Sequence, residues 1–209
     1  LMASTNRGAS FSQRWSLYPN WNGRLWIPRT GAEAGSTLYL LHEGVILRSP
    51  DKGVSFTGLG TVDASAGQGL LAGSEAGAPT IYTALKIGSA WKLYRSDDGG
   101  LSSQHVHDFG DFWGSFSAYA TASSAVIYGG VEGWRSLDGG ASFQRINPWG
   151  AYYGNPATKL HADLRGIHSF PDPRTGFTTS VCYVSTDGGL YETTDQALTV
   201  RNLSLDGLG

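Results

Sequence analysis

The sequence predicts an all-β fold of repeated antiparallel sheets, and three observations support this prediction. Glycine makes up 30 of the 209 residues, charged residues make up only 15%, and aromatic residues make up 12%. A short turn motif occurs five times along the chain. Its copies recur at a nearly regular spacing. Many glycines with few charges favour tight turns between short strands and exclude coiled coils, helical bundles and charged disordered chains.

The repeated motif reads Ser/Thr-x-Asp-x-Gly-x-Ser/Thr-aromatic. Its two best copies are residues 49–56 and 136–143, and looser copies are residues 4–11, 96–103 and 193–200. The third position holds Asn6, Asp51, Asp98, Asp138 and Asp195 in chain order. A side-chain oxygen at this position accepts hydrogen bonds from the backbone that follows it, and glycine supplies a positive φ. Each copy is therefore predicted to be a hairpin turn between two strands, and we call these segments the motif turns.

The spacing of the motif turns predicts the architecture. Their third positions lie 45, 47, 40 and 57 residues apart, and a four-stranded blade of a β-propeller takes roughly 40–50 residues. Each interval holds three β-rich runs before the motif and one after it, named strands a, b, c and d. Strand a is expected over residues 25–28, 69–73, 114–120 and 165–170, strand b over 37–41, 80–85, 125–128 and 180–184, strand c over 45–47, 91–94, 133–134 and 190–191, and the last strand d over 198–205. The chain is thus predicted to be a β-propeller of four-stranded antiparallel blades.

The motif turns resemble Asp-box repeats, also called BNR repeats, of β-propellers that include sialidases, xyloglucan-cleaving glycoside hydrolases and sortilin-type receptors. The last repeat is similar to the xyloglucanase- and sortilin-like branch, in residues 161–167 and 185–191. In that branch a His-x-Asp-x-His segment opens the blade, whereas Arg165 stands here at the place of the second histidine. The resemblance implies motif turns on the outer part of the blades, away from the face that binds ligands.

The length of the chain bears on the number of blades. We expect a single propeller segment, residues 1–209, with blade limits near 1–17, 18–62, 63–110, 111–150 and 151–209. This amounts to about four blades plus one strand, and the resemblance implies a ring of six or seven blades. Because an open arc exposes apolar faces and strand edges, we expect the remaining blades to come from the same parent chain or from partner subunits.

Two aspartates are candidates for catalysis. Glycoside hydrolysis uses two carboxyl groups roughly 5–9 Å apart. Asp163 opens the last strand a, and Asp111 stands at the equivalent place one blade earlier. The alternative is that both side chains cap or orient loops, as aspartate commonly does. A sialidase is less favoured, because the arginine-containing motif near the start of that family is absent and residues 26–29 resemble it only superficially.

Aromatic residues gather in the predicted loops and at the starts of strand a. They are Tyr18, Trp21, Phe112, Trp113, Trp149, Tyr152 and Tyr153. Flat rings stack on sugars, and the candidate ligand-binding residues are Trp21, Trp113, Trp149, His161 and Arg165. Packing between adjoining blades is the alternative, since neighbouring sheets bury large side chains.

Several classes of protein and site are disfavoured. A net charge of −2 and a pI near 6.2 argue against nucleic acid and anionic membranes as partners, and no apolar run is long enough for a membrane span. The single cysteine, Cys182, forms no internal disulfide and is expected in the core. One aspartate per turn is too few oxygens for Ca²⁺, and His105 and His107, expected on one strand face, lack a third ligand. We therefore expect no metal and no cofactor.

The sequence favours a secreted or cell-surface domain, extracellular or periplasmic, that serves as a binding or scaffold module for glycans or proteins. We expect it to bind neutral glucan-type oligosaccharides weakly without hydrolysing them. The alternative is a glycoside hydrolase, xyloglucanase-like rather than sialidase-like, in which Asp163 and Asp111 act near the propeller axis.

Overall fold

The computed structural model describes residues 1–14 and 24–207. Within these ranges the chain forms a two-stranded sheet and four four-stranded sheets, which we call the first to fourth blades. The small sheet pairs β1 (Met2–Ala3) with β2 (Ser12–Gln13). The first blade contains β3 (Arg24–Trp26), β4 (Leu38–His42), β5 (Val45–Ser49) and β6 (Thr57–Thr61), and the second contains β7 (Gln68–Ser74), β8 (Thr80–Ile87), β9 (Ala90–Ser96) and β10 (Gln104–Phe109). The third blade contains β11 (Ser115–Tyr119), β12 (Ala122–Gly129), β13 (Gly133–Ser136) and β14 (Gln144–Arg145), and the fourth contains β15 (Gly166–Pro171), β16 (Ser180–Thr186), β17 (Gly189–Thr193) and β18 (Arg201–Asn202). Strands adjacent in sequence pair antiparallel throughout each blade, so the predicted all-β chain of four-stranded antiparallel blades is confirmed.

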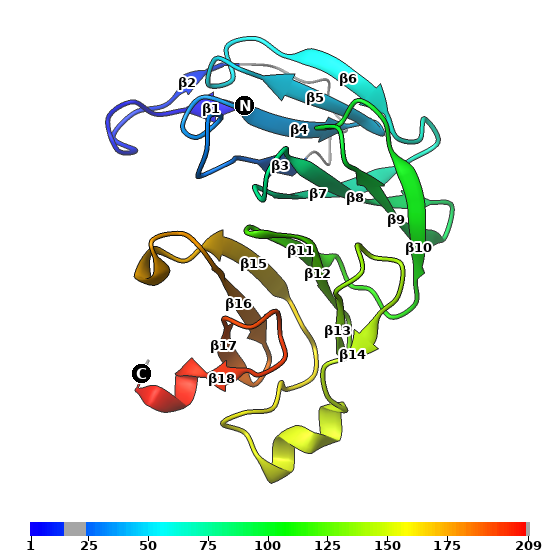
Figure 1. Ribbon diagram of the computed structural model, residues 1–209, viewed down its shortest axis with the longest axis vertical. Coiled ribbons are helices and arrows are strands. Elements are labelled where there is room, and N and C mark those ends of the chain that lie inside the picture. The colour runs from blue at the N-terminus through cyan, green and yellow to red at the C-terminus, as the bar shows by residue number, and fades with distance from the viewer. Residues whose placement is uncertain (15–23, 208–209) are drawn as a thin grey trace.

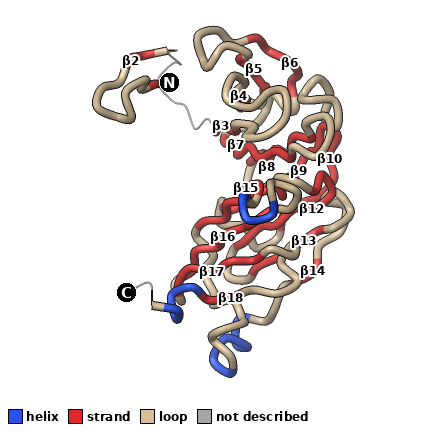
Figure 2. Tube along the Cα trace, turned by 60° about the vertical axis from the view of Figure 1, so that its left-hand side comes forward, coloured by secondary structure: helices blue, strands red, loops and turns tan. Residues whose placement is uncertain are grey.

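The four blades follow one another around an arc (Figure 1). Strands β3, β7, β11 and β15 lie on its inner side, and each contacts the next along the arc. The turned view shows the same crescent of blades, with the β1–β2 hairpin set apart from the first blade (Figure 2). The inner strands are therefore the elements that line the centre.

The cores lie between blades rather than within a single sheet. Tyr82 and Leu93 of the second blade pack with Val126 and Tyr128 of the third, and all four are almost completely buried. Equivalent clusters join the first blade to the second and the third to the fourth. Cys182 belongs to the last of these, and burial raises the pKa of its thiol to about 12. The expectation that this cysteine is a core residue is confirmed.

The motif turns form a repeated hydrogen-bond pattern. In the copy over residues 49–56, Ser49 Oγ donates to Asp51 Oδ1 and accepts from the Gly53 amide, at 2.7 and 2.8 Å. Asp51 also accepts from the amide and the hydroxyl of Ser55, at 2.9 and 2.6 Å. The same bonds recur around Asp98 and Asp138, so the predicted hairpin turn is confirmed.

The first and last motif turns show what the pattern tolerates. Asn6 accepts from the Ser10 amide as an aspartate would, but its amide group donates to the Ser10 hydroxyl instead of accepting from it. The last turn lacks glycine, and Gln196 and Ala197 both adopt a φ of 60°. The Thr199 amide and hydroxyl donate hydrogen bonds to Asp195. These bonds hold the turn in a backbone conformation that residues with a Cβ rarely adopt.

These hydrogen bonds make the motif turns sensitive to acid. Bonds from Ser55 lower the pKa of Asp51 to about 2, and bonds from Ser142 lower the pKa of Asp138 to about 2. Because the carboxylates hold their protons less tightly in the folded than in the unfolded protein, their contribution is present above about pH 4 and is lost as the pH falls through about 2. We expect Asp138→Asn to be less stable than the wild type at pH 7, and this difference to vanish near pH 2.

Urea unfolding at pH 7, 4 and 2 measures this difference. The asparagine in the first turn indicates that Asp138→Asn folds. Asp187→Asn, which removes an exposed carboxylate outside the motif turns, serves as the control. An equal loss of stability by Asp138→Asn at all three pH values would contradict the expectation.

Two local features differ from the sequence expectations. The last strand d is shorter than residues 198–205, since β18 has two residues and is followed by a 3-10 helix, η3 (Leu203–Asp206), which Asn202 caps through the Ser204 amide. His105 and His107 do not share a strand face. A β-bulge between them opposes His105 to Tyr94 but His107 to Leu93, which reverses the alternation.

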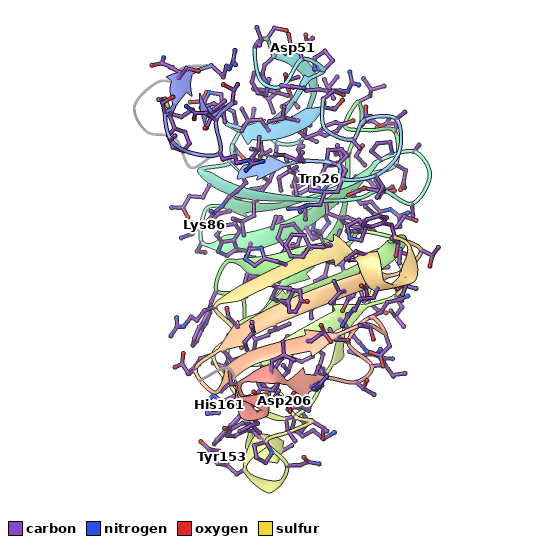
Figure 3. The ribbon with its side chains drawn as sticks, turned by 90° about the vertical axis from the view of Figure 1, so that its left-hand side faces the viewer. Trp26, Asp51, Lys86, Tyr153, His161 and Asp206 are labelled. Carbon is purple, nitrogen blue, oxygen red and sulfur yellow. The ribbon has the colours of Figure 1, made fainter. Side chains whose placement is uncertain are left out.

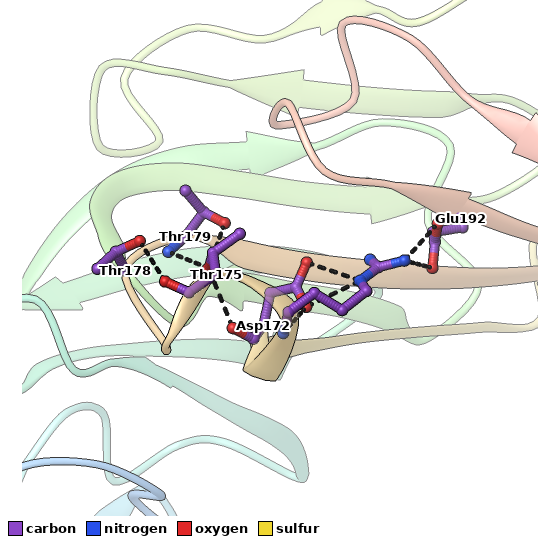
Figure 4. A network of polar contacts seen from close by, with 6 residues as sticks. Asp172, Thr175, Thr178, Thr179 and Glu192 are labelled. Atoms are coloured by element: carbon purple, nitrogen blue, oxygen red, sulfur yellow. Dashed lines mark hydrogen bonds and ion pairs between the residues drawn. The ribbon is translucent and has the colours of Figure 1, made fainter.

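The loop between β15 and β16 is fixed by a polar network (Figure 4). Asp172 accepts from the Arg174 amide and guanidinium and so caps the short helix η2 (Pro173–Thr175). The guanidinium also pairs with Glu192 across the sheet at 3.2 Å. Thr175 donates to the Asp172 carbonyl and contacts the hydroxyl of Thr179. The network holds one end of the fourth blade in a defined conformation.

Candidate functional site

A central cavity of about 640 Å³ lies where the inner strands of the four blades meet. It is lined by residues of β3, β7, β11 and β15 and of the loops that adjoin these strands, and no residue of a motif turn lines it. Figure 3 shows Asp51 of the second motif turn at one end of the molecule, and Trp26, which lines the cavity, lies further inward. The geometry keeps the turns away from the centre.

The cavity lining is rich in arginine. The lining contains Arg24, Arg29 and Arg165 but only one carboxylate, that of Glu75. Glu75 accepts from the amide and the hydroxyl of Thr30, both at 2.5 Å. Arg24, Arg29 and Glu75 carry no signal in the sequence, because only the arrangement of the blades brings these distant residues together.

Trp113 and Arg165, two of the predicted ligand-binding residues, lie together at the edge of the cavity. The Arg165 guanidinium carbon lies 4.9 Å from the centre of the Trp113 ring, and its Nε lies 3.7 Å from Asp187. Trp113 is 46% exposed, so its ring is open to solvent on the other side. Phe112, its neighbour in sequence, is instead buried between the second and third blades and stacks on Phe109.

The two predicted catalytic aspartates flank a single loop, residues 130–132. Asp111 Oδ2 accepts from the amides of Val131 and Glu132, at 2.6 and 3.2 Å. Asp163 has a φ of 65°, and its own amide donates to the Val131 carbonyl at 3.0 Å. Neither residue lines the central cavity. The Asp111 carboxylate holds a loop, which is the alternative role that the sequence left open.

Trp149 and His161 belong to a second group, the aromatic cluster of Trp149, Tyr152, Tyr153 and His161. The first three stand on a 3-10 helix, η1 (Trp149–Gly154). The Tyr153 ring contacts those of Trp149 and Tyr152 edge to face, and the Tyr152 ring contacts His161 in the same way, with ring centres 4.6 to 6.0 Å apart. Trp149 is 51% and Tyr153 69% exposed. Figure 3 shows Tyr153 and His161 side by side at the opposite end of the molecule from Asp51.

Glu132 links the aromatic cluster to the loop held by Asp111. Its carboxylate accepts from the Trp149 amide at 3.0 Å and pairs with Arg145 at the same distance, while its amide donates to Asp111. The turn containing Gly188 packs on His161, since a Cβ at that glycine would lie 2.4 Å from His161 Cβ. Loops before strand a and between strands b and c thus build one surface, which we call the rim. Trp21, the remaining predicted ligand residue, lies outside the described residues.

No cluster of three or more potential metal ligands exists among the described residues. None of the helices in the described ranges is long and apolar enough to cross a membrane.

Blades with inner strands around a central cavity define a β-propeller, and the solved structures agree. The chain is similar to the GH74 enzyme of Niastella koreensis, with a TM-score of 0.59 and 17% identity over 93% of this chain and 33% of that one. It is also similar to the GH74 xyloglucanase of Xanthomonas campestris, with a TM-score of 0.53 and 13% identity over 83% of this chain and 28% of that one. The chain thus spans about a third of these neighbours. No protein-family model and no curated protein matches the sequence.

Proposed function

We propose that the chain is a segment of an Asp-box propeller of the xyloglucanase- and sortilin-like branch, and that it binds glycans without cleaving them. The exposed aromatic cluster on the rim carries the proposal. Three rings, of Trp149, Tyr152 and Tyr153, stand together on one short helix and offer flat apolar surfaces next to polar groups. Such surfaces stack on sugar rings while the polar groups bond hydroxyls. The hydrogen bonds of the motif turns support the Asp-box assignment.

The state of the carboxylates favours binding over hydrolysis. An acid and a base or nucleophile must both reach the glycosidic bond. Asp111 is engaged by two backbone amides, and Glu132 is engaged by Arg145 and the Trp149 amide. Asp187, in the turn that packs on His161, pairs with Arg165 at 3.7 Å. The other carboxylates that these contacts place beside Asp163 in the rim thus each have a basic side chain or a backbone amide as a partner. A glycoside hydrolase stays the competing function that the experiment must separate.

The proposal includes the surroundings of this segment. We propose that further blades, from the same parent chain or from partner subunits, complete a ring of six or seven, and that the protein is extracellular, on the cell surface or periplasmic. The coverage of only about a third of the neighbouring structures supports the first statement, and the resemblance of the last repeat supports the second.

Titration with a neutral glucan oligosaccharide, followed by tryptophan fluorescence, tests the function. We expect weak binding, about fivefold to tenfold weaker in Trp149→Ala and in Tyr153→Ala, because one aromatic stacking contact contributes about 1 kcal/mol. Phe177→Ala removes an exposed ring in the loop between β15 and β16 and is the matched control. Release of reducing sugar that disappears in Asp163→Ala would replace the proposal with the hydrolase. Equal effects of all three aromatic variants would contradict the rim as the site.

A further inference from the structure

The central cavity is positively charged in a protein that is negatively charged overall. Arg24, Arg29 and Arg165 against Glu75 give its lining a formal charge of +2, whereas the whole chain carries −2. A concave site lined by one sign of charge concentrates the field and attracts ligands of the opposite sign. The lining therefore favours an anion, which the rim proposal does not explain.

Two of the three guanidinium groups in the cavity lining, those of Arg24 and Arg29, are available for a ligand, whereas Arg165 pairs with Asp187. Among the described residues, the Arg24 guanidinium has no hydrogen-bond or ion-pair partner, while the Arg24 backbone pairs with Leu41 in the sheet. The Arg29 guanidinium carbon lies 4.5 Å from the centre of the Phe170 ring, and an arginine stacked on an aromatic ring keeps donors for a further partner. Glu75 is held by Thr30 rather than by an arginine. Stacked and unpaired arginines are suited to bidentate binding of carboxylates.

The rest of the lining suits an oligosaccharide. The inner strands are the edge strands of their sheets, so backbone N–H and C=O groups on their free side face the centre. Trp26, Phe116 and Phe170 add aromatic surface. The volume of about 640 Å³ lies within the usual range of small-ligand sites. Backbone groups of this kind can hydrogen-bond sugar hydroxyls, and rings of this kind can pack on sugar faces.

A peptide strand fits the cavity less well. Cα atoms of neighbouring inner strands, β3 with β7, β7 with β11 and β11 with β15, approach within 8 Å. A strand inserted between two of them would need a separation of about 9.6 Å, twice the usual spacing. Insertion of a peptide strand between two neighbouring inner strands is therefore disfavoured.

We propose that the central cavity binds a carboxylate-bearing oligosaccharide, of the uronate class, at a site separate from the aromatic cluster. The arginines bind the carboxylates, and the strand edges and aromatic rings bind the sugar. Arg24 and Arg29 carry the specificity for the charged over the neutral sugar.

Calorimetric titration with a galacturonate trimer, a neutral glucose trimer and a glutamate tripeptide tests the proposal. We expect the galacturonate trimer to bind more tightly than the other two ligands. Its binding to Arg24→Gln and to Arg29→Gln is expected to be at least tenfold weaker than to the wild type. Binding to the wild type is also expected to be weaker in 0.5 M salt. Arg7→Gln, the same change in the exposed first motif turn, is the control and leaves binding unchanged. The melting temperature of each variant shows that it is folded.

Three results would overturn the cavity proposal. The first is binding of the neutral trimer as tight as that of the galacturonate trimer. The second is equally tight binding of the glutamate tripeptide with the same dependence on Arg24 and Arg29. The third is a loss of galacturonate binding in Arg7→Gln equal to the loss in the cavity variants. Trp149→Ala separates this site from the rim, because it weakens binding of neutral glucan but leaves uronate binding intact. Loss of uronate binding in Trp149→Ala would show a single site and would overturn the separate one.

Discussion

Replacing Gly140 with alanine is expected to lower the free energy of unfolding by about 2–4 kcal/mol. Gly140 has a φ of 90°, and an added Cβ would lie 2.7 Å from Leu93 Cδ2 and 3.2 Å from Val106 Cγ2 of the preceding blade. Leu93 is completely buried, so it has little room to move. The left-handed backbone costs a residue with a Cβ about 1–2 kcal/mol, and overpacking costs about 1–3 kcal/mol.

Urea unfolding of Gly140→Ala beside Gly110→Ala tests this expectation. No atom lies within 4 Å of a Cβ at Gly110 and its φ is not left-handed, so that variant is expected within about 0.5 kcal/mol of the wild type. In a Leu93→Ala background the cost of Gly140→Ala should shrink, because the clash is removed and the two changes are coupled. Additive effects of the two substitutions would show that the contact between blades is not the cause.

The same contact explains why the fifth motif turn can lack glycine. Gly100 packs on Ile46 and Gly140 packs on Leu93, and each partner stands three residues before the motif serine of the preceding blade. In the third blade that position is Gly133, and the fourth blade has Ala197 where its neighbours have glycine. Where the position three residues before the motif serine is a glycine, the motif turn of the next blade thus has a residue with a Cβ at its glycine position. The sequence reveals the motif but not this pairing, since the partners belong to different repeats.

The repeats made the strands predictable, while the site depended on contacts between repeats. The serine, aspartate and glycine of each motif act within eight residues, so local chemistry suffices to place the turns and the strands beside them. Asp111 stands at the place of Asp163 in its own repeat, but its partners are amides some 20 residues away. The aromatic run at residues 149–153 was visible in the sequence. Its contact with His161 required the closing of the loop between the third and fourth blades.

Leu164→Ala is expected to lower the free energy of unfolding by as much as Gly140→Ala or more. It is also expected to loosen the rim. Leu164 is completely buried between the third and fourth blades. Its side chain lies against Gly129 and Gly133, where added Cβ atoms would come within 2.4 and 3.1 Å of it. Truncating a buried leucine costs about 2–5 kcal/mol, which for a chain of this size lowers the melting temperature by about 5–15 °C.

The position of Leu164 in the chain connects this loss to the candidate site. The residue stands between Asp163 and Arg165, its amide donates to the Gly130 carbonyl, and its carbonyl accepts from Ser115 Oγ. Without the buried side chain, the segment that holds Asp163 and Arg165 loses its anchor. We expect faster hydrogen exchange at the Arg165 amide, which donates to the Ser185 carbonyl, together with the lower melting temperature. Leu198→Ala, an exposed leucine of the last motif turn, should change neither measurement. A destabilised Leu164→Ala with unchanged exchange at Arg165 would show that the rim is held by its hydrogen bonds alone.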